Sequence, residues 1–314
     1  MDLDLAQVRA FAVTVEEAHF GRAAERLGIS QQALSKRIVR LEAALGARLL
    51  DRGPRGAGPT AAGRRFLEPA RRALAASAEA AAAVRGAHRP LRIDVWGHLY
   101  TPMRTVASVA TRIPDLALEP GPARDLPSVA AALASGGTDV GFGRVHPLPG
   151  RWDAGLTHRL VRLEPVDAVV GAGHPLAAET VLRPERLRGS VLRAPSALER
   201  LDFLARFAGH FGIDARGGGA NLGSEHFLQQ IRDDPGCFSL FPADSPLPDV
   251  PGIRSIPLAD PTPLYAWSLL WRTGAGHPLL DTLVAGFAEE GDKSRWLEYV
   301  PGRDWLPEGE RLRT

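Results

Sequence analysis

The sequence has a single cysteine, Cys237, which excludes an intrachain disulfide and a metal site built from this chain's thiolates alone. It also lacks any apolar run near the roughly 18–20 residues that a membrane-spanning helix needs. Its first residues have neither the basic start nor the apolar segment of a secretory signal, so we expect a cytoplasmic protein. The overall composition, with 45% hydrophobic and 24% charged residues, is typical of globular proteins. A chain of 314 residues is long enough for two or more domains.

The patterns of common catalytic sites are missing as well. The sequence has no Gly-x-Gly-x-x-Gly between a predicted strand and helix, no Walker loop, and no His-x-x-x-His pair among its nine histidines. The run Gly217–Gly219 is not followed by a lysine and is typical of a turn. Nothing indicates a nucleophile triad, so we expect no enzymatic activity, no metal ion and no cofactor.

Positive charge is concentrated at the start of the chain. Residues 1–90 carry 15 lysines and arginines against 9 aspartates and glutamates, a net of +6, and the remainder carries a net of −4. A basic head on a mildly acidic body is typical of a nucleic-acid-binding domain joined to a non-binding one. The alternative is that the arginines only solubilise an alanine-rich helical surface.

The segment Phe20–Leu45 has the pattern of two short helices joined by a tight turn. Gly28 closes the first helix, where a left-handed conformation favours glycine, and Ser30 is a suitable N-cap for the second. One stripe of the second helix is apolar, and the opposite side is polar and basic, with Gln32, Ser35, Lys36 and Arg40. This pattern indicates a helix-turn-helix whose second helix enters a major groove, and a plain helical hairpin is the alternative.

The flanking segments favour the DNA-binding interpretation. Apolar spacing predicts a helix over Asp4–Val15, and an extended segment followed by the Gly/Pro-rich loop Gly53–Pro59 predicts a wing. A long helix over Thr60–Val84 contains Pro69, which should kink it, and its near-heptad apolar stripe needs a partner, most simply a second copy of itself. Gly86–Pro90 is rich in helix breakers, so we expect a domain boundary there.

Beyond this boundary, predicted strands and helices alternate, which indicates parallel sheets with helices on both faces, divided into two sub-lobes. The expected strands are 91–96, 116–119, 139–142, 159–163, 166–170, 191–193, 219–222, 237–241 and 265–271. The expected helices are 102–112, 126–134, 184–188, 198–211, 225–232 and 278–288.

With these parts in place, the chain resembles the LysR-type transcriptional regulators. The most specific resemblance lies in the first 90 residues, in the runs Leu5–Phe11, Ala23–Leu27, Ser30–Ser35, Leu49–Arg52 and Thr60–Gly63. Weaker resemblances follow at Asp139–Gly141 and Gly173–Ala177.

The resemblance implies an α/β protein with an all-α head. Its parts are a winged helix-turn-helix over residues 1–59, a linker helix that pairs protomers over 60–89, and a periplasmic-binding-protein-like effector domain over 90–288. We expect lobe 1 of this domain at about 91–163 and 265–288 and lobe 2 at about 166–260, with crossings near Leu163–Asp167 and Ile256–Leu264. The family binds promoter inverted repeats as dimers or dimers of dimers, and a small-molecule effector in the interlobe cleft changes transcription.

The expected DNA contacts come from the second helix of the motif and its surroundings. We expect Gln32 and Lys36 to read bases because they project furthest from the apolar stripe. The full set is Ser30, Gln31, Gln32, Ser35, Lys36, Arg37, Arg40, Arg52, Arg55 and Thr60.

Effector contacts are expected at turns after strands, where free amides and helix N-termini favour an anion. The candidates are His98, Tyr100, Thr101, Arg144, His146, Ser196, Asn221 and Ser224. Each has a structural alternative: the histidines belong to loops, Thr101 and Ser224 cap helices, and Tyr100 is a core residue.

Residues 289–314 run past the usual end of the family and contain Trp296, Tyr299 and Trp305. We expect these aromatic residues to pack on the body rather than to bind a partner. The alternative function for the whole chain is a small-molecule-binding protein or enzyme that uses its N-terminal helices only for oligomerisation.

Overall fold

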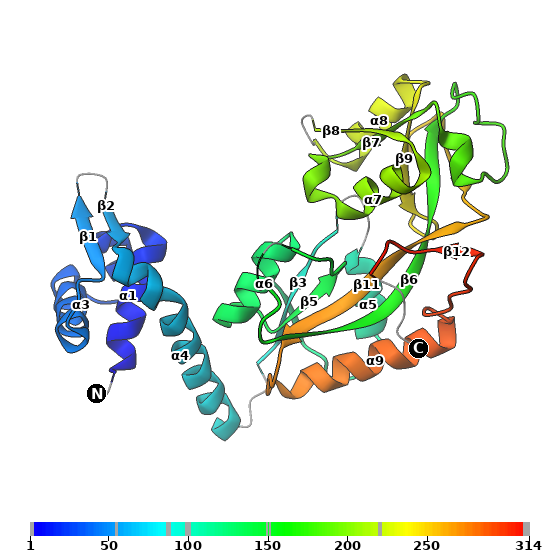
Figure 1. Cartoon of the computed structure of the whole chain (residues 1–314). Coiled ribbons are helices and arrows are strands. Elements are labelled where there is room, and N and C mark those ends of the chain that lie inside the picture. The colour runs from blue at the N-terminus through cyan, green and yellow to red at the C-terminus, as the bar shows by residue number, and fades with distance from the viewer. Residues whose placement is uncertain are drawn as a thin grey trace.

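The computed structural model describes residues 3–53, 56–85, 89–97, 102–148, 150, 152–218 and 222–309. Figure 1 shows a small helical head with a hairpin, a long helix leaving it, and a larger body made of two lobes. We call the lobe that contains β3 (Leu91–Val95), β4 (Leu118–Pro120) and β5 (Val140–Gly143) lobe 1. The lobe that contains β7 (Val191–Ala194), β8 (Asp214–Gly217) and β9 (Cys237–Pro242) is lobe 2.

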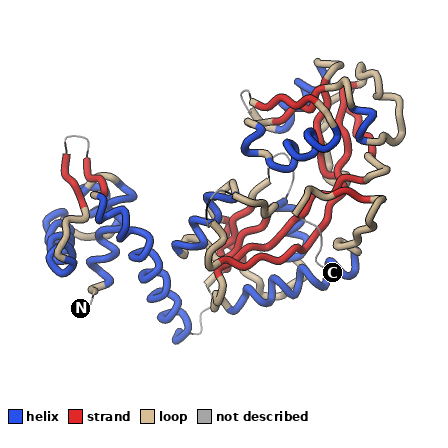
Figure 2. Tube along the Cα trace, in the orientation of Figure 1, coloured by secondary structure: helices blue, strands red, loops and turns tan. Residues whose placement is uncertain are grey.

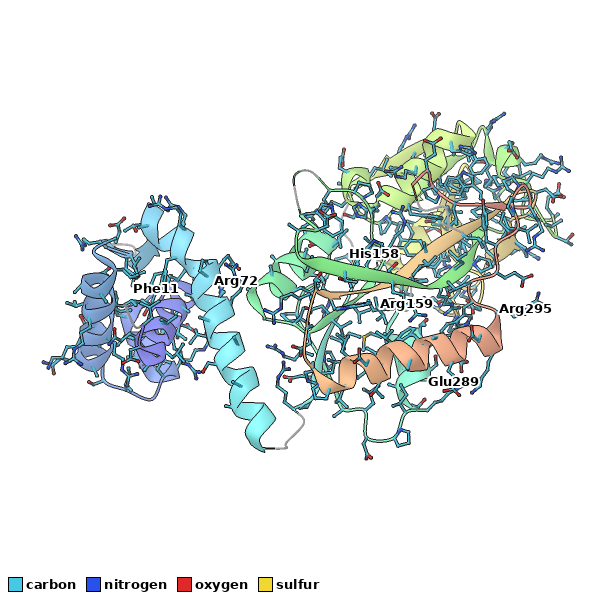
Figure 3. All side chains as sticks on the ribbon, turned by 60° about the horizontal axis from the view of Figure 1, so that its bottom comes forward. Phe11, Arg72, His158, Arg159, Glu289 and Arg295 are labelled. Carbon is cyan, nitrogen blue, oxygen red and sulfur yellow. The ribbon has the colours of Figure 1, made fainter. Side chains whose placement is uncertain are left out.

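The head consists of three helices and a two-stranded antiparallel hairpin, namely α1 (Leu5–Glu17), α2 (Phe20–Arg26), α3 (Gln31–Leu45), β1 (Leu50–Gly53) and β2 (Gly56–Pro59). Asp4 caps α1 as predicted, and its carboxylate accepts a hydrogen bond from the Ala6 amide. Phe11 is fully buried between the helices (Figure 3) and packs with Leu34, Ile38 and Leu41 of α3. The predicted helix-turn-helix and the hairpin of the wing are both present.

The long helix α4 (Ala61–Arg85) continues through Pro69. The sequence predicted a second copy of the chain as the partner for its whole apolar stripe, but the first half of the stripe packs on the head. Phe66, Ala70 and Leu74 join the head's core, and the Phe66 ring lies 5.5 Å from that of Phe11. Further along, α4 contacts α6 of the body.

The body begins with the elements of lobe 1 and continues into those of lobe 2. Lobe 1 contains β3 (Leu91–Val95), α5 (Pro102–Ala110), β4 (Leu118–Pro120), α6 (Leu126–Ser135) and β5 (Val140–Gly143). Lobe 2 contains η1 (Pro184–Leu187), β7 (Val191–Ala194), η2 (Leu198–Arg200), α7 (Asp202–Phe211), β8 (Asp214–Gly217), α8 (Ser224–Asp233), β9 (Cys237–Pro242) and β10 (Ile253–Pro257). The remaining elements are β6 (Leu156–Gly171), β11 (Thr262–Arg272), α9 (Pro278–Ser294) and β12 (Asp304–Trp305).

A pair of long antiparallel strands joins the two lobes. Along the sheet the order is β4-β3-β5-β11-β6-β9-β7-β8, with β10 paired to β6 and β12 to β11. Figure 2 shows that the long strand β6 runs without interruption from lobe 1 into lobe 2. Along β6 the partner changes from β11, up to Pro165, to β9, from Val166 onward.

This topology corrects the prediction of parallel sheets. The outer strands of each lobe pair in parallel, but β6 is antiparallel to β9, β10 and β11. The two strands predicted at 159–163 and 166–170 are one strand of 16 residues. Pro165 has no amide hydrogen to donate, and it lies where the pairing partner of β6 changes from β11 to β9, a position at which a strand tolerates proline.

Other elements also differ from the prediction. The helix predicted at 198–211 is interrupted at Leu201, which separates η2 from α7. Of the strand predicted at 219–222, residues 219–221 lie outside the described residues, and the strand β8 that precedes them was not predicted. Both β10 and β12 were unexpected, because each is short and is held by pairing with a strand distant in sequence. None of the helices described is long and apolar enough to span a membrane.

A buried carboxylate anchors the start of the body. Asp139 accepts hydrogen bonds from Arg89 Nη1 at 2.5 Å and Nη2 at 2.6 Å, and from the Arg92 amide at 2.9 Å. Arg92 also contacts it through its guanidinium at 3.0 Å. Burial alone would raise the pKa of Asp139, but these hydrogen bonds hold it well below its usual range. The chain that follows the linker helix is thereby fixed to the edge of lobe 1.

We expect Asp139→Asn to lower the free energy of unfolding by about 1–3 kcal/mol at pH 7, because the two arginines lose a charged acceptor. A carboxylate with a depressed folded-state pKa stabilises the protein above its unfolded pKa, near 3.9, and loses this contribution as the pH falls. Urea unfolding of both proteins should therefore show a difference that is constant above about pH 5 and shrinks towards pH 2. A difference that does not vary with pH would contradict this assignment.

Candidate nucleic-acid interface and effector cavity

The second helix of the helix-turn-helix, α3, is fixed at its start by a side-chain cap. Ser30 Oγ accepts a hydrogen bond from the Ala33 amide at 3.2 Å, and Gly28 precedes it with φ +63°, a conformation that favours glycine. His19 Nδ1 caps α2 in the same way through the Gly21 amide. These caps fix the residues at which α2 and α3 begin.

The face of α3 that points away from the head's core is polar and accessible. Leu34, Ile38 and Leu41 are buried on the inner stripe. The exposed side chains of the outer face are those of Gln31, Gln32, Lys36, Val39 and Arg40, whereas Ser35 and Arg37 are half-buried. The two expected base readers, Gln32 and Lys36, are both exposed. Six of the predicted DNA contacts therefore lie on this one helix, namely Gln31, Gln32, Ser35, Lys36, Arg37 and Arg40.

The hairpin is attached directly to α3. Glu42 Oε1 accepts hydrogen bonds from the amides of Leu49 and Leu50, at 2.7 and 3.1 Å. Thr60 Oγ1 donates to the Arg48 carbonyl at 2.7 Å and accepts from the Gly63 amide, so its hydroxyl has a structural role at the start of α4. The positions of two predicted contacts to the DNA backbone are not given, because Arg55 and the side chain of Arg52 lie outside the described residues.

A cavity of about 500 Å³ lies between the two lobes. Its wall is mainly apolar and aromatic, with Trp96 and Leu126 from lobe 1, Phe203, Leu204 and Leu240 from lobe 2, and Tyr265 from β11. The exposed charged residues Arg124, Asp125, Glu199 and Arg200 also line it. Gly143 allows this packing, because a Cβ there would lie 2.2 Å from the Trp96 ring.

An ion pair crosses this cavity. Arg144, only 3% exposed, follows β5 in lobe 1, and its Nη1 lies 2.5 Å from Oδ2 of Asp202 at the start of α7 in lobe 2. Burial alone would raise the pKa of Asp202, but the charge of Arg144 and the hydrogen bonds from Arg144 and Arg206 hold it below its usual value. The Arg144 guanidinium also lies 5.7 Å from the centre of the Phe203 ring.

The structure brings two of the eight predicted effector contacts into the cavity wall, Arg144 and His146. Burial lowers the pKa of His146, which favours the neutral ring. Ser196 and Ser224 are not among the lining residues: the Ser196 carbonyl accepts from the Gly218 amide, and Ser224 begins α8. His98, Tyr100, Thr101 and Asn221 lie outside the described residues.

Sequence reasoning missed most of the wall, in particular Trp96, Asp202, Phe203 and Tyr265. Only Trp96 gave a local signal, because it ends a predicted strand whose carboxyl end should face a cleft. The other three residues lie more than 50 positions from Trp96 in sequence, and no local pattern predicts that they contact the same cavity.

A second polar cluster lies where the strands cross between lobes. Arg162 Nη2 pairs with Glu164 at 2.9 Å and with Asp244 of lobe 2 at 2.5 Å, and its Nη1 donates to Thr105 of α5 at 2.7 Å. Trp267 Nε1 donates to Glu164 at 2.6 Å. Burial raises the pKa of Glu164 to about 7, although Arg162 opposes the shift. Among the described residues, no group of three or more His, Cys, Asp or Glu side chains is placed to hold a metal ion.

Two family models match the chain. The bacterial regulatory helix-turn-helix protein model of the LysR family matches residues 5–64, and the LysR substrate binding domain model matches residues 100–292. The first match covers the helix-turn-helix and the hairpin, and the second covers the two lobes that enclose the cavity.

Individual relatives agree with these matches. The chain is 31% identical to the HTH-type transcriptional regulator IlvR of Caulobacter vibrioides over 92% of this chain and 99% of that one. It is 35% identical to the HTH-type transcriptional regulator YnfL of Escherichia coli, where the alignment spans 56% of this chain and 60% of the relative.

Solved structures show the same fold. Full-length OxyR from Pseudomonas aeruginosa superposes with a TM-score of 0.67 at 21% identity, over 92% of this chain and 97% of that one. CbnR in complex with its target DNA superposes with a TM-score of 0.65 at 23% identity, over 93% of this chain and 100% of that one. The alternative of a head used only for oligomerisation is removed by the family match to that head. The chain belongs to the LysR family, and it is a DNA-binding transcriptional regulator, not an enzyme, with an effector-binding domain.

Proposed function

We propose that α3 reads an inverted repeat in promoter DNA and that a small molecule in the interlobe cavity controls this binding in the cytoplasm. The observation that carries the first part is the outer face of α3, where amide and cationic side chains stand exposed above a buried apolar stripe. Gln and Lys at such positions hydrogen-bond to base edges in the major groove. The contacts that we assign to the recognition helix are Gln31, Gln32, Ser35, Lys36, Arg37 and Arg40, and those that we assign to the DNA backbone are Ser30, Arg52, Arg55 and Thr60.

The oligomeric state follows from how α4 is partnered. Its first half is covered by the head, so we assign the pairing of protomers to the half beyond Leu74. An inverted repeat needs two such heads in a fixed relation, because protein two-fold symmetry and half-site spacing correspond. Dimers, or dimers of dimers, meet this need.

The cavity supports the second part of the proposal. About 500 Å³ is within the range of small-molecule sites, and the wall combines a large apolar area with a few buried polar groups. We assign Arg144 and His146 to the effector site, and we retain His98, Tyr100 and Thr101 as candidates because they closely follow the lining residues Trp96 and Gly97 in sequence. Asn221 is retained as a candidate from the sequence alone. An effector that reaches Arg144 meets the ion pair to Asp202, so occupancy and the contact between lobes are coupled.

Lys36→Ala should weaken binding to the operator upstream of the protein's own coding sequence by about 1–3 kcal/mol, because a base-edge contact is lost. Fluorescence anisotropy of a labelled promoter fragment measures this, at several salt concentrations. A phosphate contact would instead lower the salt dependence of log K by about one unit per charge and affect all sequences alike.

The matched control is Lys293→Ala, since Lys293 is the other lysine of the chain and lies at the exposed end of α9. It should leave operator affinity unchanged. Equal affinities for Lys36→Ala and the unmodified protein would disprove the assignment of Lys36. If the unmodified protein did not bind the operator fragment even at low salt, the proposed function would be disproved.

A ligand that binds only the folded protein raises its melting temperature, with a stabilisation of about 2.7 kcal/mol at one hundred times its Kd. Screening carboxylates, phenolics and amino-acid metabolites by thermal shift should therefore yield a stabilising compound. Leu148→Trp should abolish its effect, because Leu148 is half-buried in the cavity wall and the larger ring occupies the space. The control Leu247→Trp changes a half-buried leucine in a separate cluster of lobe 2 and should keep the effect. A compound that stabilises both variants equally binds outside the cavity.

A further inference from the structure

The C-terminal tail makes a connection between the lobes that the family match does not include. The effector-domain match ends at residue 292, and the described chain continues to residue 309. In Figure 1 this last segment, drawn in red, leaves the end of α9 and returns along β11 towards lobe 2. We call residues 295–308 the C-terminal strap.

The first part of the strap is fixed to the strands at the crossing between lobes. The Trp296 carbonyl accepts a hydrogen bond from the Leu163 amide of β6 at 2.7 Å, and the Arg162 guanidinium lies 5.0 Å from the Trp296 ring. The Thr262 amide at the start of β11 donates to the Arg303 carbonyl at 2.8 Å. The strap then forms β12, which pairs in parallel with the first residues of β11.

The second part of the strap packs on a helix of lobe 2. Trp305 is 8% exposed, and its ring lies 5.3 to 5.9 Å from the rings of Phe203, Phe207, Phe211 and His210, all on α7. The three phenylalanines are spaced four residues apart and form one stripe of the helix. Arg206 of the same helix donates to the Glu308 carbonyl at 3.4 Å. A single tryptophan therefore covers one face of α7 along its length.

This face leads directly to the cavity. Phe203 contacts Trp305 and also lines the cavity, where its ring meets Tyr265 at 5.0 Å and the Arg144 guanidinium at 5.7 Å. Its neighbour Asp202 makes the ion pair to Arg144 across the lobes. Trp305 is not a lining residue, so it acts on the cavity through the first turn of α7.

We propose that the C-terminal strap is a third connection between the lobes and that Trp305 is a positioning residue for the effector cavity. By binding the crossing strands at one end and α7 at the other, the strap restricts rotation of lobe 2 about β6 and β11. Trp305 holds Phe203 and Asp202 where they meet Arg144. This inference rests on the proposed function only in treating the cavity as the effector site, and the restriction of lobe movement stands without it.

The test measures the distance between lobes in the full-length protein, free of DNA and added ligand. Spin labels are placed at Ala131→Cys on α6 and Val181→Cys in lobe 2, both exposed, in a Cys237→Ser background. Serine keeps the donor to Asp234 that Cys237 Sγ supplies. The labelled protein is mixed with an excess of unlabelled protein, so that distances within one protomer dominate the signal. Double electron–electron resonance should then give one narrow distance distribution, and Trp305→Ala should widen it about twofold or shift its mean, as expected for a released hinge.

Two variants show whether the effect is specific to the contact with α7. Trp305→Phe keeps an aromatic ring on the stripe and should restore the narrow distribution. Leu297→Ala changes a residue of the same strap that is 41% exposed and should leave the distribution unchanged. Circular dichroism confirms that each variant is folded before its distances are compared.

If Trp305→Ala does not fold, Asp304→Ala replaces it. Asp304 accepts a hydrogen bond from the Val300 amide at 2.7 Å, so its loss loosens β12 without opening a cavity beside α7. It should also widen the distribution. An unchanged distribution in a folded strap variant overturns the proposal, while operator binding, measured separately, tests the proposed function.

Discussion

The pairing of β6 with β11 is the constraint on which the body depends. These strands are antiparallel, β6 continues from lobe 1 into lobe 2, and the pair brings Arg162, Glu164 and Trp267 together at the crossing between lobes. Since each lobe also builds a parallel sheet of its own on one end of this pair, the lobes are two separately packed units on a common axis. The cavity lies between them, and contacts across it, such as Arg144 with Asp202, govern how the units are oriented.

The head is held together by different means. Its core is small, and α4 completes it by placing Phe66, Ala70 and Leu74 against α1 and its neighbours. The linker helix is therefore part of the DNA-binding unit as well as its connection to the body. The orientation of α3 follows that of α4, because the Glu42 carboxylate also fixes the hairpin that leads into α4.

Local patterns predicted the head almost completely. The Ser30 cap, the left-handed Gly28 and the stripe of Leu34, Ile38 and Leu41 depend on residues close in sequence, and each is present. The body was less predictable, because its decisive contacts are distant in sequence. The Arg144–Asp202 pair joins residues 58 positions apart, and the Trp267–Glu164 hydrogen bond joins residues 103 apart.

The errors share one physical cause. The strands at 159–163 and 166–170 and the helix at 198–211 were predicted from local patterns, whereas pairing and packing with other segments decided that β6 continues and that the helix is interrupted. The cavity wall could not be assembled from the sequence for the same reason. The resemblance to a family supplied the place of the cleft but not the aromatic residues that line it.

The short strand β5 has a charged residue at each end. Asp139, which holds Arg89 and Arg92, immediately precedes the strand, and Arg144 immediately follows it. A four-residue strand paired on both sides barely stretches, at about 3.3 Å per residue. Under the proposed function, an effector that displaces the Arg144 guanidinium would therefore also displace, through this one strand, the Asp139 carboxylate that holds Arg89 and Arg92 after the linker helix.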